Sequence, residues 1–177
     1  MVIRQHYLTI KFPNTLLGCQ TKAMGMLTFY NAVANGGRMV KLQAEGNDVV
    51  VLNEQIAESA HIATLQKGLE HAVKRGLFRK AGRSYTSVAA CGRTFYTKGN
   101  NRRMELCGYF PADNPMYTIM VILEKYGGPT SAGSMCGNIM AKTIDVLVDS
   151  YDLRSMLVRE FEESEDVVEV VDTVAVG

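Results

Sequence analysis

Residues 84–140 constrain the fold more than any other part of the 177-residue chain. Two runs rich in β-forming residues flank residues 98–101, a Lys-Gly-Asn-Asn loop in which glycine and asparagine tolerate positive φ. A third run begins at Met116 and ends at Glu124, directly after the turn residues 113–115. This order predicts a three-stranded antiparallel meander.

A helix is expected to follow the meander. Residues 127–129, Gly-Gly-Pro, interrupt the chain, and either Thr130 or Ser131 can cap a helix that starts there. The apolar face of this helix repeats at helical spacing and comprises Met135, Ile139, Met140, Thr143, Ile144 and Leu147. The predicted fold class is therefore α+β, with an antiparallel sheet packed against helices.

The remaining elements are predicted from periodicity and turn residues. They are a strand at residues 5–12, a helix from Thr21 to Ala34, a hairpin of residues 38–43 and 48–52, an amphipathic helix at 55–74, a basic loop at 75–83, a short helix at 153–163 and a strand at 167–176. With 47% apolar residues, the chain can bury a core. We predict one domain over residues 1–151 and an appendage over 152–177.

The charge distribution is uneven although the chain carries a formal net charge of only +1. Near neutrality argues against a nucleic-acid or membrane-surface role. Residues 152–177 contain eight acidic residues and two arginines, a net charge of −6, which leaves +7 for the rest. The sequence shows neither a run of about 20 apolar residues nor the apolar segment of a signal peptide, which predicts a cytoplasmic protein without a membrane span.

Cysteine and histidine positions predict no metal site and no cofactor. The four cysteines form no C-x-x-C pair, and His61 and His71 are ten residues apart on one predicted helix, nearly three turns from each other. Cys91 and Cys107 lie on neighbouring predicted strands and could face each other. Free thiols are favoured over a disulfide, because four cysteines in a chain of this length are not a disulfide scaffold.

Several segments of the chain match motifs of a known family. They are Gly92-Arg93-Thr94, then Cys-Gly-Tyr-Phe-Pro-Ala-Asp-Asn-Pro at 107–115, then Tyr-Gly-Gly at 126–128, and upstream Met-Leu-Thr-Phe-Tyr-Asn-Ala-Val-Ala-Asn-Gly-Gly at 26–37. In this order and spacing they resemble the C-terminal half of the transpeptidase domain of penicillin-binding proteins. The resemblance covers roughly residues 15–150. It implies a partial β-lactamase/transpeptidase-like fold. Whole members of the family act outside the cytoplasmic membrane, and this localisation disagrees with the absence of an export signal in the sequence.

The resemblance also implies where a site would lie. The family acylates a serine that has a lysine three residues later, assisted by a Ser-x-Asn motif, and no serine of this sequence has either neighbour. The family's third motif, Lys-Thr-Gly, is altered to Arg93-Thr94-Phe95, followed by Tyr96. Arginine keeps the charge but cannot shuttle a proton, and a benzyl group should fill space that glycine leaves open. These four residues are predicted to be a vestigial substrate-binding site, or ordinary strand residues, and no catalytic residue is assigned.

Two functions follow as hypotheses. The first is a non-catalytic transpeptidase-like domain that serves as a binding or structural module. The second is a peptidoglycan D,D-transpeptidase or carboxypeptidase completed by a partner chain or by unrecognised residues, and a decayed remnant of a longer gene is a third possibility. In the first, the strand from Met116 to Glu124 would present an open edge. We expect residues 5–12, residues 167–176 or a second copy of the chain to cover it.

Overall fold

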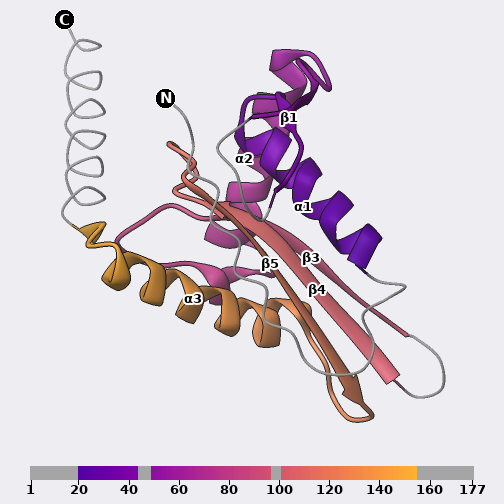
Figure 1. The fold of residues 1–177 in the computed structure, drawn as a ribbon. Coiled ribbons are helices and arrows are strands. Elements are labelled where there is room, and N and C mark those ends of the chain that lie inside the picture. The colour runs from indigo at the N-terminus through magenta and orange to yellow at the C-terminus, as the bar shows by residue number, and fades with distance from the viewer. Residues whose placement is uncertain (1–19, 44–48, 97–100, 155–177) are drawn as a thin grey trace, which may run out of the picture.

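A computed structural model describes residues 20–43, 49–96 and 101–154. Its helices are α1 (Gln20–Ala34), α2 (Ser59–Lys74) and α3 (Gly137–Ser150), with a short turn η1 (Arg79–Ala81) before the main sheet and a turn η2 (Ala132–Cys136) leading into α3. Its strands are β1 (Met39–Val40), β2 (Val51–Asn53), β3 (Ala89–Tyr96), β4 (Asn101–Phe110) and β5 (Tyr117–Tyr126). Helices α1 and α2 lie on one side of the main sheet and α3 on the other (Figure 1).

The main sheet is the predicted antiparallel meander, with strand order β3-β4-β5. Cys91 pairs with Cys107 across the first hairpin, and Cys107 pairs with Met120 across the second. The third strand extends two residues beyond the predicted end, to Tyr126. The prediction of an α+β fold with a three-stranded meander is confirmed.

Each face of the sheet carries its own cluster of buried side chains, because successive residues of a strand point to opposite sides. The face toward α3 contributes Ala90, Met104, Leu106, Phe110, Tyr117 and Val121, which pack with Cys136, Met140, Ile144 and Val148. The face toward α1 and α2 contributes Ala89, Cys107 and Tyr109, which pack with Tyr30, Val33, Ala34 and Leu69. Helices on both faces therefore make this sheet the centre of the molecule.

Glycines of the sheet are required by close packing. A Cβ on Gly108 would lie 2.5 Å from the Cβ of Ala90 and 2.3 Å from the carbonyl oxygen of Ala89, on the neighbouring strand. A Cβ on Gly92 would lie 2.3 Å from the carbonyl oxygen of Glu105. Both contacts are far shorter than a carbon atom allows, so only glycine fits this packing between β3 and β4.

The segment that leads into α3 resolves the choice between two caps. The hydroxyl of Ser131 accepts a hydrogen bond from the backbone N–H of Ser134 at 3.2 Å, which is the geometry of an N-terminal cap. Thr130 instead accepts a hydrogen bond from Arg102 on β4 at 3.2 Å. Of the two predicted caps, Ser131 is thus the one used.

The start of α2 differs from the prediction. The helix begins at Ser59, not at residues 55–56. The side-chain nitrogen of Gln55 donates to the carbonyl oxygens of Gly36 and Ala57, at 3.1 and 2.6 Å, and its backbone N–H donates to Asn53. These bonds hold residues 54–58 in a bent connection between the β1-β2 hairpin and α2, and the helix begins after it.

A polar contact joins the segment before β3 to α3. Arg83 donates two hydrogen bonds to the carboxylate of Asp145, each at 2.6 Å, and the Tyr85 hydroxyl donates to the same group. The Arg83 hydrogen bond holds the pKa of Asp145 below its ordinary value. The segment predicted as a basic loop at residues 75–83 contains the short helix η1, and its last residue, Arg83, is in this way anchored to α3.

Parts of the prediction lie outside the described residues: the strand at 5–12, the strand at 167–176 and nearly all of the acidic appendage. The core continues into the start of that appendage, since Leu153 is buried against it. Within the described residues, β5 pairs with β4 alone. No helix in the described ranges is both long enough and apolar enough to span a bilayer.

Candidate functional site

The four residues predicted as a vestigial site occupy the second half of β3 and divide between its two faces. Arg93 and Phe95 lie on the side of α1, where Arg93 contributes to a cavity with residues of that helix. Thr94 and Tyr96 lie on the side of α3. The four residues are consecutive in β3, but their side chains lie on opposite faces of the sheet and do not form one site.

Arg93 is held by a carboxylate on the neighbouring strand. Its Nε and Nη2 atoms each lie 2.9 Å from Oε2 of Glu105, the residue opposite it on β4. The other carboxylate oxygen, Oε1, accepts a hydrogen bond from Nε of Arg103 at 2.7 Å, and Arg103 also donates to Glu124 on β5 at 3.3 Å. Glu105 and Arg103 are buried. The charge of Arg93 is thus neutralised within a network that spans all three strands.

The hydroxyl of Thr94 serves the fold on the opposite face. It accepts a hydrogen bond from the backbone N–H of Ala132 at 3.0 Å, at the first residue of the turn that leads into α3. The first N–H groups of a helical segment have no partner within it, so this bond satisfies a donor that would otherwise be buried unpaired. Thr94 thereby fixes the helix start to the sheet.

Phe95 and Tyr96 each stack against an arginine. The guanidinium of Arg93 lies 4.9 Å from the ring centroid of Phe95, and that of Arg102 lies 4.8 Å from the ring centroid of Tyr96. Both distances fall in the range of cation–π contacts. Every residue of the predicted site therefore has a partner within the chain.

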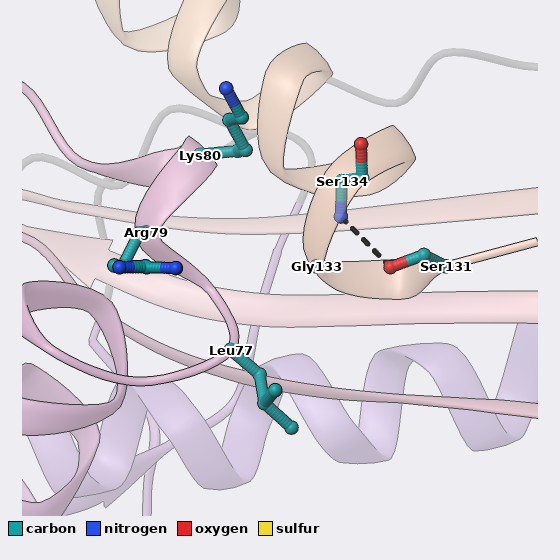
Figure 2. Close-up of a pocket in the computed structure, with 6 residues that line it drawn as sticks. All are labelled: Leu77, Arg79, Lys80, Ser131, Gly133 and Ser134. Atoms are coloured by element: carbon teal, nitrogen blue, oxygen red, sulfur yellow. Dashed lines mark hydrogen bonds between the residues drawn. The ribbon is translucent and has the colours of Figure 1, made fainter.

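A second candidate is a polar cavity of about 330 Å³ between the loop after α2 and the turn before α3 (Figure 2). It is lined by Leu77, Arg79, Lys80, Ser131, Gly133 and Ser134. The two segments touch, since a Cβ on Gly133 would lie 2.2 Å from the carbonyl oxygen of Leu77. Sequence patterns did not predict this cavity, because its residues come from segments about 50 positions apart.

This cavity contains serines and a lysine but no activated nucleophile. The hydroxyl of Ser131 is the cap acceptor for the N–H of Ser134, as Figure 2 shows. A serine becomes a nucleophile when a base takes its proton, and among the described residues neither serine of this cavity is hydrogen-bonded to Lys80.

Two of the described cysteines, Cys107 and Cys136, are not poised as nucleophiles either. Burial raises the pKa of the Cys107 thiol, and it raises the pKa of Cys136 to about 11. Both are neutral thiols at neutral pH, whereas the thiolate is the reactive form. Across the described ranges, no group of three or more His, Cys, Asp and Glu residues is arranged to hold a metal ion.

Comparison with known families decides the relationship. The model of the penicillin binding protein transpeptidase domain matches residues 9–145. The chain belongs to this family. The resemblance found in the sequence motifs is thereby confirmed. Among curated proteins, no sequence matches this one.

Solved transpeptidase domains share the fold. The transpeptidase domain of the FtsI4 D,D-transpeptidase from Legionella pneumophila is 24% identical, with a TM-score of 0.57 over 69% of this chain and 45% of that one. The transpeptidase domain of penicillin-binding protein 3 from Burkholderia pseudomallei is 17% identical, with a TM-score of 0.63 over 72% and 42%. The D,D-transpeptidase domain of a peptidoglycan glycosyltransferase from Eggerthella lenta is 18% identical, with a TM-score of 0.55 over 69% and 31%. This transpeptidase-like chain spans less than half the length of these structures.

Proposed function

We propose that this transpeptidase-like domain is a non-catalytic binding or structural module. The observation that carries the proposal is the engagement of Arg93 and Thr94, at the positions of the family's Lys-Thr motif, in contacts within the chain. An ammonium and a hydroxyl that serve a substrate carboxylate must be available to it. Here the cation is bound to Glu105, and the hydroxyl accepts a backbone N–H at the start of the α3 segment.

Two further features support the proposal. The printed sequence has no serine followed three residues later by lysine, so it offers no nucleophile of the family's kind. Phe95 replaces the glycine of the third motif, and its ring is stacked with Arg93 at 4.9 Å. Freeing Arg93 for a ligand would therefore break an ion pair and a cation–π contact together.

Labelling with a fluorescent penicillin tests the proposal. We expect the full chain to remain unlabelled while an active penicillin-binding protein, treated in parallel, becomes labelled. The variant with Arg93→Lys and Phe95→Gly restores the family's Lys-Thr-Gly and is also expected to stay unlabelled, because it still lacks the serine. A covalent adduct on the wild-type chain would overturn the proposal.

The alternative is a D,D-transpeptidase or carboxypeptidase completed by a partner chain. It is favoured by the family assignment, since the structural relatives include D,D-transpeptidases of more than twice the matched length. Labelling an extract of the source organism, isolating this chain with its bound partners under native conditions and then separating the chains under denaturing conditions distinguishes the two. An adduct on this chain or on a partner that is isolated with it would support the alternative, and the absence of any adduct in the isolated complex supports the non-catalytic module.

As part of this module, we expect the free edge of β5 to be paired. An uncovered edge invites aggregation, and natural proteins rarely leave one. Residues 5–12, residues 167–176 and β5 of a second copy are the three candidates. Hydrogen exchange tests this directly: the β5 amides that point away from β4 should be protected, and unprotected exchange would refute the pairing. Light scattering of the full chain then distinguishes a dimer from an internal strand.

A further inference from the structure

Three sulfur-bearing side chains form a row across the sheet. Cys91 on β3, Cys107 on β4 and Met120 on β5 are directly opposite one another in the two antiparallel pairings. Opposite residues of antiparallel strands have Cα atoms about 4.5–5.5 Å apart, and their side chains leave the sheet on the same side. The row faces α1, since all three side chains pack in the cluster on that side.

Helix α1 adds a fourth sulfur. Met26 lines the same cavity as the three residues of the row, together with Tyr30 from the next turn of the helix. The cavity has a volume of about 160 Å³, several times the ~30 Å³ that one water molecule occupies in the liquid. Two cysteines and two methionines from four different elements therefore line one cavity that is large enough to hold an ion.

The chemistry of this cavity suits a soft ion. Thiolate and thioether sulfur are the ligands that select Cu(I), whereas zinc sites use cysteine, histidine and carboxylate and are filled by four such ligands. The cavity has only two thiols, and the one carboxylate on its wall, that of Glu105, is bound by two arginines. Methionine supplies the remaining sulfur atoms.

An ion has to displace the thiol protons before it can bind, and burial, which raises the pKa of the Cys107 thiol, opposes that step. A buried thiol keeps its proton until a stronger Lewis acid displaces it, and a bound metal ion deprotonates coordinating thiols. Arg93 also lines the cavity, and its charge is already paired with that of Glu105.

We propose that Cys91 and Cys107, with Met26 and Met120, form a binding site for a soft monovalent metal ion, of which Cu(I) is the representative. Binding replaces the two thiol protons by one ion, so two protons pass to solvent and no electron is transferred. The site changes from neutral to a single negative charge. Sequence spacing did not predict it, because no two of the four ligands lie on the same helix or strand.

The test is a Cu(I) titration of the reduced full chain without oxygen, in competition with a chromophoric Cu(I) chelator. We expect one ion per chain, with sulfur scattering in the first shell of the X-ray absorption spectrum. The variants Cys91→Ser and Cys107→Ser should each lose this binding. Met120→Leu, which keeps the side-chain volume, should weaken it by at least about tenfold, because it removes one of the four sulfur ligands.

A matched control uses the other two cysteines. Cys136 is buried on the opposite face of the sheet, so the variant with Cys19→Ser and Cys136→Ser should bind one ion as the wild type does. Circular dichroism confirms that each variant is folded. Equal binding by the variant with Cys91→Ser and Cys107→Ser, or no binding by the wild type, would overturn the proposal. Rapid formation of a Cys91–Cys107 disulfide that Cu(I) does not prevent would overturn it in favour of a redox pair.

Discussion

The variant Glu105→Gln tests the network that holds Arg93. Glutamine keeps the shape of the side chain but removes the charge that faces two guanidinium groups, at 2.9 Å from Arg93 and 2.7 Å from Arg103. The side chain of Arg103 is only 9% exposed, whereas that of Arg93 is 62% exposed. The cost should therefore come mainly from leaving the buried Arg103 without its nearest carboxylate.

The magnitude follows from the burial. Removing one partner of a buried ion pair costs about 3–5 kcal/mol. Glutamine retains one acceptor oxygen and Glu124 still contacts Arg103, so we expect the lower end, about 3 kcal/mol. For a chain of this size, this lowers the melting temperature by about 6–12 °C, and in urea unfolding it moves the midpoint down by about 1.5 M for a slope of about 2 kcal/mol per M.

Two controls sharpen the measurement. Glu54→Gln makes the same chemical change in an ion pair with Arg38, whose side chains are 78% and 52% exposed, and should cost less than about 1 kcal/mol. Arg93→Gln should also cost about 1 kcal/mol or less, because its guanidinium is mostly exposed. The reasoning is refuted if Glu105→Gln is no more costly than Glu54→Gln, or if Arg93→Gln is the most costly of the three.

Three other substitutions test the packing and polar contacts of the fold by thermal unfolding. Gly108→Ala should destabilise the chain by about 1–3 kcal/mol, because the new methyl group meets Ala90 at 2.5 Å, and an unchanged melting temperature would contradict the tight strand packing. Thr94→Val removes the acceptor for a backbone N–H at the start of the α3 segment and should cost about 1–2 kcal/mol, while Thr94→Ser should retain most of the stability. Asp145→Asn should cost about 1 kcal/mol at neutral pH, since the contact with Arg83 is partly exposed. The pKa of Asp145 is lowered in the folded state, so this stabilisation is present above the ordinary carboxyl pKa of about 3.9 and is lost as the pH falls through the folded value. The melting temperatures of the wild type and of Asp145→Asn should therefore become equal in acid. A difference in melting temperature that is constant at all pH values would disprove the linkage.

Much of the fold could be predicted because its signals are local. The Lys-Gly-Asn-Asn loop and the turn at 113–115 set the order of the three strands, and Ser131 marks the helix start by its own side-chain chemistry. The start of α2 could not be predicted in this way. Its first expected turn is taken by Gln55, which bonds to Gly36, a residue 19 positions earlier.

The candidate site was likewise predictable only where it depends on local sequence. The sequence by itself determined the family, the missing serine motifs and the altered residues Arg93 to Tyr96, since these depend only on residue types and their spacing. Only the tertiary structure decided that Arg93 pairs with Glu105, that Thr94 bonds to the start of the α3 segment, and that two cysteines and two methionines line one cavity. Alternation along a strand shows which residues share a face, but strand register and the helix that covers that face arise from packing between distant segments, and those contacts give each side chain its partner.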